Sequence, residues 1–399
     1  SATLNSVPFT SGTTVTAEGT YVLIVTDLAG NVTTINFVID KTAPIVTGVE
    51  HNQYYNTNRT ITFNEGSATL NSISFTSGTT VTAEGTYVLI VTDLAGNVTT
   101  INFVIDKTAP IVTGVEHNQY YNTNRTITFN EGSATLNSVP FTSGTTVTAE
   151  GTYVLIVTDL AGNVTTINFV IDKTAPIVTG VEHNQYYNTN RTITFNEGSA
   201  TLNSAPFTSG TTVTAEGTYV LIVTDLAGNV TTINFVIDKT DPIVTGVVDG
   251  SYYNDPPKAA VFTETTATLN GAAYLSGTPI TADDLYTLVV TDLAGNVTTI
   301  TFTIDTIAPI VTGVEHNQYY NTNRTITFNE GSATLNSVPF TSGTTVTAEG
   351  TYVLIVTDLA GNVTTINFVI DKTAPIVTGV EHNQYYNTNR TITFNEGSA

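Results

Sequence analysis

The sequence predicts an all-β protein that is a linear array of antiparallel β-sandwich repeats of about 66 residues each. A ten-residue motif, TDLAGNVTTI, recurs at steps of 66 residues, once 67. Between its copies, polar and apolar residues alternate in short runs that Gly, Asn and Asp separate, as in half-buried strands joined by tight turns. No run of ten residues has the apolar spacing of a helix. The copies begin at Thr26, Thr92, Thr158, Thr224, Thr291 and Thr357.

The repeated motif itself predicts a tight turn between two strands. Gly30 supplies the positive φ that the chain reversal needs, and the side chains of Asp27 and Asn31 can bond nearby backbone amides. The residues on both sides of this turn are β-branched, which favours strands.

The elements of one full repeat follow in order from its punctuation. Pro44 stops the previous strand, and the polar segment 50–58, which carries Tyr54 and Tyr55, is a predicted loop. Asn64 to Gly66 predicts a turn, and Ala83 to Gly85 predicts a corner. The predicted strands are 45–49, 59–63, 68–70, a short one around 75, 80–82, 86–92 and 98–105.

Seven or so short strands with frequent turns predict a compact sandwich of the immunoglobulin-like kind. Tyr87 supports this, because such sandwiches place a tyrosine just after a corner, where its hydroxyl ties the corner down. Without cysteine, this corner and the Leu, Ile, Val and Phe core must hold each repeat. The equivalent tyrosines are Tyr21, Tyr153, Tyr219, Tyr286 and Tyr352.

Composition excludes several classes of function. The formal net charge of −22, with 11 Lys and Arg, argues against nucleic-acid binding and against anionic membrane surfaces. No apolar run is long enough to span a membrane, so no membrane insertion is expected. Apolar residues are plentiful and regularly placed, which distinguishes the chain from an acidic disordered tail.

Several motifs resemble tandem bacterial immunoglobulin-like repeats of mainly Gram-positive surface proteins and giant adhesins. They are PIVTGV, TITFNEG, ATLN and TDLAGN, followed by DKTAP in most repeats. The resemblance covers essentially the whole chain and implies an extracellular, cell-surface or secreted setting. It also implies that the array acts as a stalk holding a terminal binding domain away from the cell, and that calcium binds at some junctions.

The linkers divide the chain into repeats. The fourth complete repeat diverges, with Asp255-Pro-Pro-Lys258 and Asp305-Thr306 replacing the usual residues. The predicted boundaries are 1–40 (the second part of a repeat), 42–106, 108–172, 174–238, 240–305 (divergent), 307–371 and 373–399 (the first part of a repeat).

The two partial repeats have two explanations, which the sequence leaves open. A longer array cut in this register would produce them. Alternatively, residues 373–399 of one molecule complete residues 1–40 of the next by strand addition, which would make the chain a head-to-tail filament subunit. The partner would then be the chain itself.

A possible metal site follows from the predicted topology. The linker, the turn after the second strand and the last hairpin turn meet at one end of such a sandwich. Three carboxylates and an amide there suit calcium, with Asp241 as an additional acid in the divergent repeat. The alternative is that these are structural turn residues and that Lys107 and its equivalents neutralise part of the cluster. The sets are Asp40, Glu65, Asp93 and Asn97; Asp106, Glu131, Asp159 and Asn163; Asp172, Glu197, Asp225 and Asn229; Asp238, Glu264, Asp292 and Asn296; and Asp305, Glu330, Asp358 and Asn362.

Other chemistry is not indicated. Each ordinary repeat offers a single histidine, such as His51, and no cysteine, which does not suffice for zinc or for a catalytic triad. No catalytic residue, enzymatic activity or required cofactor is therefore predicted. Tyr54 and Tyr55 raise the further alternative of a carbohydrate- or protein-binding array, against the simpler expectation of one core ring and one loop ring. Any host or surface ligand is expected to bind outside this segment.

Overall fold

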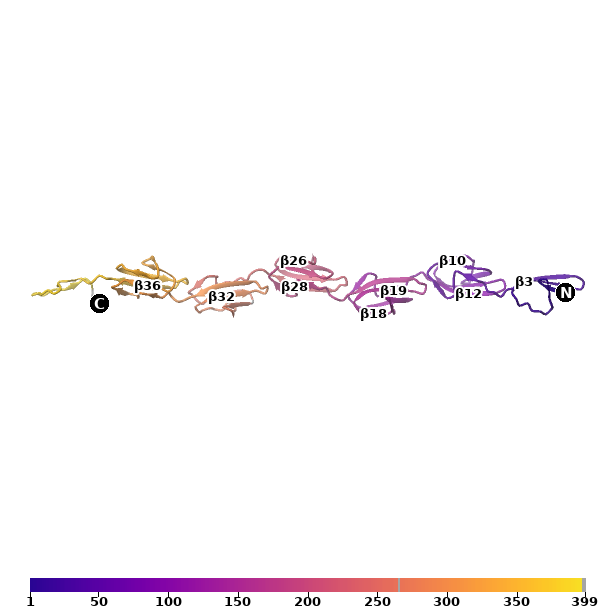
Figure 1. Cartoon of the computed structure of the whole chain (residues 1–399), viewed down its shortest axis with the longest axis horizontal. Coiled ribbons are helices and arrows are strands. Elements are labelled where there is room, and N and C mark those ends of the chain that lie inside the picture. Colours follow the sequence, from indigo (N-terminus) through magenta and orange to yellow (C-terminus); the bar gives the residue numbers. More distant parts are fainter. Residues whose placement is uncertain (265, 397–399) are drawn as a thin grey trace. The chain divides into compact units, whose positions relative to one another are not determined.

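The computed structural model describes residues 1–264 and 266–396, and every regular element there is a β-strand or an isolated β-bridge (Figure 1). These residues form two compact units. Unit 1 comprises residues 1–177, 195–200 and 222–231, and unit 2 comprises the described residues of 178–194, 201–221 and 232–399. Within the described chain there is no helix long and apolar enough to cross a membrane. The all-β prediction is confirmed.

The repeat 42–106 in unit 1 shows the architecture, in which two sheets lie in separate layers. In Figure 1, β10 and β12 mark the two layers. The three-stranded sheet has the order β10 (Thr79–Val81), β7 (Arg59–Phe63), β5 (Val46–Thr47). The five-stranded sheet has the order β6 (Gln53–Tyr55), β12 (Val98–Ile105), β11 (Gly85–Thr92), β8 (Ser67–Leu70), β9 (Ile73–Phe75).

Equivalent strands recur along the chain. In residues 108–172 they are β13 (Val112–Thr113), β14 (Gln119–Tyr121), β15 (Arg125–Phe129), β16 (Ser133–Leu136), β17 (Val139–Phe141), β18 (Thr145–Val147), β19 (Gly151–Thr158) and β20 (Val164–Ile171). In residues 174–238 they are β21 (Val178–Thr179), β22 (Gln185–Tyr187), β23 (Arg191–Phe195), β24 (Ser199–Leu202), β25 (Ala205–Phe207), β26 (Thr211–Val213), β27 (Gly217–Thr224) and β28 (Val230–Ile237). In residues 307–371 they are β34 (Val311–Thr312), β35 (Gln318–Tyr320), β36 (Arg324–Phe328), β37 (Ser332–Leu335), β38 (Val338–Phe340), β39 (Thr344–Val346), β40 (Gly350–Thr357) and β41 (Val363–Ile370).

The structure corrects two details of the predicted strands. The segment 50–58 is not all loop, because β6 lies within it and pairs parallel to the end of β12, with Tyr55 opposite Ile105. The first strand is shorter than predicted and is confined to β5. The parallel pair was missed because a three-residue polar strand has no alternation long enough to detect.

Apolar side chains from both sheets fill the space between the layers. Ile61 of β7 and Leu89 of β11 are fully buried. Phe103 is 1 % exposed, and the ring of Tyr87 stacks on it with centroids 5.1 Å apart. Each buried Val, Leu, Ile or Phe side chain contributes about 1.5–3 kcal/mol. The period-two pattern of β11 and β12 therefore places one face of this hairpin in the core.

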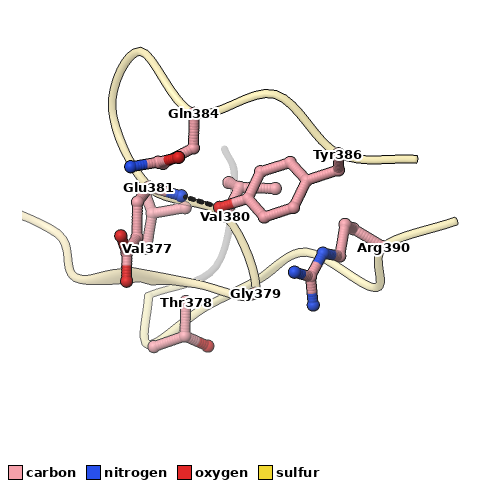
Figure 2. Close-up of a pocket in the computed structure, with 8 residues that line it drawn as sticks. All are labelled: Val377, Thr378, Gly379, Val380, Glu381, Gln384, Tyr386 and Arg390. Atoms are coloured by element: carbon pink, nitrogen blue, oxygen red, sulfur yellow. Dashed lines mark hydrogen bonds between the residues drawn. The ribbon is translucent and has the colours of Figure 1, made fainter. Parts of the chain in front are cut away.

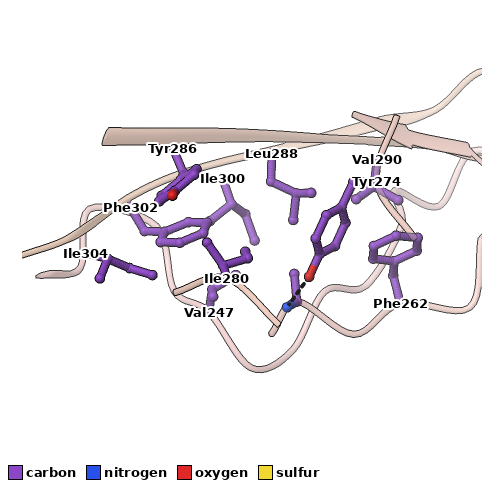
Figure 3. Close-up of a cluster of buried hydrophobic side chains, with 11 residues drawn as sticks. Val247, Phe262, Tyr274, Ile280, Tyr286, Leu288, Val290, Ile300, Phe302 and Ile304 are labelled. Atoms are coloured by element: carbon purple, nitrogen blue, oxygen red, sulfur yellow. Dashed lines mark hydrogen bonds between the residues drawn. The ribbon is translucent and has the colours of Figure 1, made fainter. Parts of the chain in front are cut away.

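The divergent repeat 240–305 repacks the same core (Figure 3). Ala260 stands where Ile61 stands in the first complete repeat, and Tyr274 replaces Phe75. The larger ring fills the space, and its hydroxyl accepts a hydrogen bond from the Ala260 amide at 3.0 Å. Burial raises the pKa of Tyr274, although this hydrogen bond opposes the shift. The strands are β29 (Tyr252–Tyr253), β30 (Thr266–Leu269), β31 (Ala272–Ala273), β32 (Asp284–Thr291) and β33 (Val297–Ile304).

The two partial repeats have less regular structure. Residues 1–40 form a single four-stranded sheet, and residues 373–396 form only one short strand pair. The strands are β1 (Ala2–Leu4), β2 (Val7–Pro8), β3 (Gly19–Thr26) and β4 (Val32–Ile39), and β42 (Val377–Thr378) and β43 (Thr393–Phe394).

Candidate functional site at the repeat junctions

The repeated motif forms the predicted turn between the last two strands of each repeat. In the turn after β11, Gly96 has φ +91°. Asp93 Oδ1 accepts the Asn97 amide at 2.9 Å, and Asp93 Oδ2 accepts Asn97 Nδ2 at 2.8 Å. The aspartate therefore caps the turn, as the structural alternative expected.

The turn aspartates have low pKa values. Burial raises the pKa of Asp159, but hydrogen bonds from the Asn163 side chain and from the Asn163, Gly162 and Ala161 amides together lower it below the usual value. The same balance lowers the pKa of Asp93, Asp225 and Asp292. These carboxylates are consequently ionised at neutral pH.

The same asparagine joins the turn to the incoming linker. Asn97 Nδ2 donates to the Asp40 carbonyl at 3.1 Å, and Thr99 Oγ1 donates to the Pro44 carbonyl at 2.5 Å. The linker-to-turn bond recurs within each unit, at 2.8 Å, in the pairs Asp106–Asn163, Asp172–Asn229, Asp238–Asn296 and Asp305–Asn362. The predicted convergence of linker and last hairpin is thus observed, but it is made by a backbone carbonyl and an amide.

The preceding repeat also holds the linker, through a residue that the sequence did not single out. Glu84, in the corner before β11, accepts the Lys107 amide at 2.8 Å and the Thr108 hydroxyl at 3.0 Å. Lys107 Nζ donates to the Thr82 carbonyl. In the divergent repeat, Asp283 accepts the Thr306 amide at 3.2 Å in the same way. The recurrence of glutamate in the Ala-Glu-Gly corner of successive repeats was the sequence signal that could have indicated this role of Glu84.

One predicted carboxylate set gathers closely. Asp106, Glu131 and Asp159 each place one carboxylate oxygen within 4.8 Å of the others. Asp159 is buried, and the other two are half-buried. Lys107 does not neutralise this cluster, since its ammonium group bonds the Thr82 carbonyl of the preceding repeat. Among the described residues no lysine or arginine forms an ion pair with these acids, and their three carboxylates form a hard-oxygen donor set that suits calcium.

The glutamates of the predicted sets, Glu131 included, accept hydrogen bonds from their sequence neighbours. Glu65 accepts from Asn64 Nδ2 at 3.0 Å, and Glu264 accepts from the Thr263 hydroxyl at 3.1 Å. Glu197 and Glu330 accept from the preceding asparagine in the same way. Asp241 is an exposed linker residue. In residues 1–264 and 266–396, the cluster of Asp106, Glu131 and Asp159 is the group of three acids close enough to share a metal ion.

The tyrosine pair does not form a platform. Tyr54 and Tyr55 are adjacent in β6, so their rings lie on opposite faces of the strand. Tyr55 packs edge-on to Phe103 at 6.4 Å, while Tyr54 is 37 % exposed. One ring therefore belongs to the core, as the simpler expectation held. His51 accepts the Asn102 amide through Nδ1 at 3.2 Å and has a structural role in this loop.

A shallow hollow beside the tyrosine recurs along the chain, and Figure 2 shows the copy at residues 377–390. Tyr386 accepts the Glu381 amide at 2.7 Å, and the Arg390 guanidinium lies 4.1 Å from its ring centre. In the first complete repeat, Arg59 Nε also donates to the Gly48 carbonyl at 2.7 Å. The arginine is thus held by its own repeat and braces the loop.

No protein-family model matches the sequence, and no curated protein matches it. Several solved structures match the chain. The N-terminal eight Ig domains of Down syndrome cell adhesion molecule match at 9 % identity and TM-score 0.26, over 90 % of this chain and 64 % of that chain. Immunoglobulin domains 1–5 of Sidekick-1 match at 12 % identity and TM-score 0.21, over 83 % and 97 %. The human desmocollin-1 ectodomain matches at 11 % and 0.15, over 82 % and 99 %.

Proposed function

We propose that this chain is the stiff stalk of a bacterial extracellular surface protein, which holds a binding domain outside this segment away from the cell. The observation that carries the proposal is the double attachment of each linker. At the junction 106–110, Glu84 of the preceding repeat and Asn163 of the following repeat both bond the linker backbone. A linker held on both sides loses the freedom of a flexible tether.

The resemblance to bacterial immunoglobulin-like repeats supports an extracellular setting for such a stalk. The acidity of the chain also suits this role, since like charges along the array oppose its collapse. The role is mechanical and spatial and needs no catalytic residue.

Small-angle X-ray scattering on the whole chain tests the stalk. We expect an extended particle that gains about 35–40 Å per repeat, from strands of about eight residues plus a linker. Replacing the junction threonines by valine removes their bonds to the linker prolines and should shorten the mean end-to-end distance. The changes are Thr99→Val, Thr165→Val, Thr231→Val, Thr298→Val and Thr364→Val.

The matched control replaces the next residue of each strand, which is also a threonine. These side chains do not bond the linkers, and valine is equally favourable in a strand. The control set is Thr100→Val, Thr166→Val, Thr232→Val, Thr299→Val and Thr365→Val. A compact wild-type particle, or equal effects of both sets, would contradict the proposed stalk.

We also propose that calcium binds between repeats at Asp106, Glu131 and Asp159, and at the equivalent acids of the other junctions. The close approach of three carboxylates, none of which has an ion-pair partner in the described chain, supports this. A bound cation would relieve their mutual repulsion and strengthen the junction.

Isothermal titration with calcium, and thermal unfolding with calcium or with EGTA, test this site. We expect calcium to raise the Tm, and Glu131→Gln to remove one binding equivalent without unfolding the repeat, since Gln keeps an acceptor for Asn130. Glu116→Gln, in an exposed loop of the same repeat, is the control and should bind as the wild type does. No heat of binding and no change in Tm would show that these acids are turn residues only.

A further inference from the structure

The edge of the five-stranded sheet differs between the complete repeats at one residue. The edge strands β17, β25 and β38 carry a proline at their middle position, Pro140, Pro206 and Pro339. In the repeat 42–106 the edge strand β9 has Ser74 at that position. Proline has no backbone N–H, whereas serine keeps one. The strand β9 therefore has a backbone donor that the edge strands of these three repeats lack.

The backbone N–H of Ser74 points away from its own sheet. In the antiparallel pair of β8 and β9, Thr69 lies opposite Ser74, and Phe75 belongs to the next pair. The divergent repeat shows which pair of this ladder is hydrogen-bonded, because the amide of Tyr274, the equivalent of Phe75, donates to the Ala267 carbonyl at 2.9 Å. Bonded and non-bonded pairs alternate along an antiparallel ladder. Thr69 and Ser74 therefore form a non-bonded pair, and the N–H and C=O of Ser74 face the free edge.

This outward direction gives the prolines of the other repeats a physical reason. The free edge of a sheet is a template for pairing with another strand, and a proline at an outward-facing position blocks such pairing. The repeat 42–106, which the structure describes throughout, has β9 at the edge of its sheet without that protection. Ser74 is exposed, and the neighbouring Ile73 is 74 % exposed. The edge is therefore open to a further strand.

The distribution of charge favours a second copy of the same edge as the partner. Within the fully described repeat 42–106, the strands β6, β12, β11, β8 and β9 contain no Asp, Glu, Lys or Arg. The net charge of the chain is −22, so two copies repel each other over most of their surface. Two β9 edges can approach without opposing like charges. Antiparallel pairing also places the acidic turn at Glu65 of one copy and that of the other at opposite ends of the joined edge.

We propose that β9 is an interaction surface for β9 of a second copy of this chain, which adds to the sheet antiparallel about a two-fold axis at Ser74. Each Ser74 N–H then donates to the Ser74 carbonyl of the other copy, so the outward groups of both copies are satisfied together. Ile73 of each copy lies opposite Phe75 of the other. The pairing is a strand addition between two chains and does not depend on the stalk role.

Exchange of serine and proline tests this surface by sedimentation of the whole chain over a range of concentrations. We expect the wild-type chain to be in equilibrium between monomer and dimer. Ser74→Pro gives β9 the proline that three other repeats already accommodate, and it should abolish the dimer while thermal unfolding stays unchanged. Ser74→Ala is the matched control, because it removes the hydroxyl and keeps the N–H, and it should dimerise as the wild type does.

The converse change in the next repeat should create a second surface. Pro140→Ser gives β17 the same outward N–H, so each chain then has two open edges and should form particles larger than dimers. In the divergent repeat Ala273 also keeps its N–H, but its strand β31 has only two residues, both alanine. Ala273→Pro should therefore leave the wild-type dimer unchanged.

Engineered thiols test the register, since the chain has no cysteine. Residues that form a hydrogen-bonded antiparallel pair have Cα atoms about 5.5 Å apart, which a disulfide can span. Ser74→Cys should therefore yield a disulfide-linked dimer under mild oxidation. Thr100→Cys is the control, because Thr100 is also exposed but lies on β12, with β11 and β8 between it and the edge. It should yield no dimer above background.

The proposal is overturned if the wild-type chain stays monomeric at all concentrations, or if Ser74→Pro associates as the wild type does. Loss of the dimer in Ser74→Ala would assign the contact to the hydroxyl group and would also overturn it. Equal cross-linking of Ser74→Cys and Thr100→Cys would show random collision of exposed thiols, which contradicts the proposed register.

Discussion

The hydroxyl group of the corner tyrosine stabilises a small repeat that has no disulfide. Tyr87 donates to the Ala83 carbonyl at 2.9 Å, while its ring stacks on Phe103 in the core. The corner is thereby tied to the hairpin that supplies most of the core. The expectation from the sequence about this hydroxyl is confirmed, and the bond recurs in each complete repeat.

Removing that hydroxyl gives a prediction at the residue scale. Phenylalanine at all five corners, Tyr87, Tyr153, Tyr219, Tyr286 and Tyr352, keeps the ring and loses one hydrogen bond per repeat. Such a bond contributes about 1 kcal/mol, so calorimetry should show a fall in Tm of about 4–8 °C. The control places phenylalanine at Tyr54, Tyr120, Tyr186, Tyr252 and Tyr319, which lie outside the core. An equal fall in Tm in the control variant would show that the loss of any tyrosine hydroxyl has this effect, and that the corner hydrogen bond has no special role.

At the scale of elements, glycines with similar φ values have different structural roles. Gly132 (φ +81°) and Gly144 (φ +89°) both occupy the left-handed region. A Cβ on Gly132 would lie 2.3 Å from the Thr158 carbonyl oxygen, whereas a Cβ on Gly144 would meet nothing within 4 Å. Gly132 therefore allows the backbone at the start of β16 to lie in close contact with the end of β19. Gly144 supplies only the left-handed backbone conformation of a turn.

This difference predicts unequal costs for alanine. Gly144→Ala should lower the free energy of unfolding of its repeat by about 1–2 kcal/mol, the cost of a left-handed conformation. Gly132→Ala should cost more, because backbone atoms must also move. To make the loss visible by calorimetry, alanine is placed at Gly66, Gly132, Gly198 and Gly331 in one variant and at Gly78, Gly144, Gly210 and Gly343 in the other. Similar Tm values for the two variants would contradict the role given to the close contact.

For the whole molecule, the repeat boundaries predict a mechanical signature. A repeat of about 65 residues gains about 190 Å of contour length when it is pulled apart. Single-molecule stretching of the whole chain should give up to five such steps, four of them at similar force, since four complete repeats are nearly identical in sequence. The step of the repeat 240–305 should differ in force, because its core is repacked around Tyr274. Steps of a different length would show that the boundaries are wrong.

The sequence by itself determined the features that depend on local periodicity and turn chemistry. The motif spacing predicted the repeats, and the alternation of polar and apolar residues predicted the strands β11 and β12. Gly30 predicted a turn that needs a positive φ, and its φ in the structure is +92°. It also identified Asp93 as a turn residue whose side chain bonds a nearby backbone amide, which in the structure is the amide of Asn97.

Tertiary structure alone decided the features that join distant residues. The parallel pairing of β6 with β12 and the hold of Glu84 on the next linker depend on contacts that no local pattern encodes. The end segments make the same point. Residues 13–15 and 145–147 are identical in sequence, yet only the second group is a strand, because only there does a partner accept its hydrogen bonds. A β-strand is completed by its neighbour, so identity of sequence is not enough to form it.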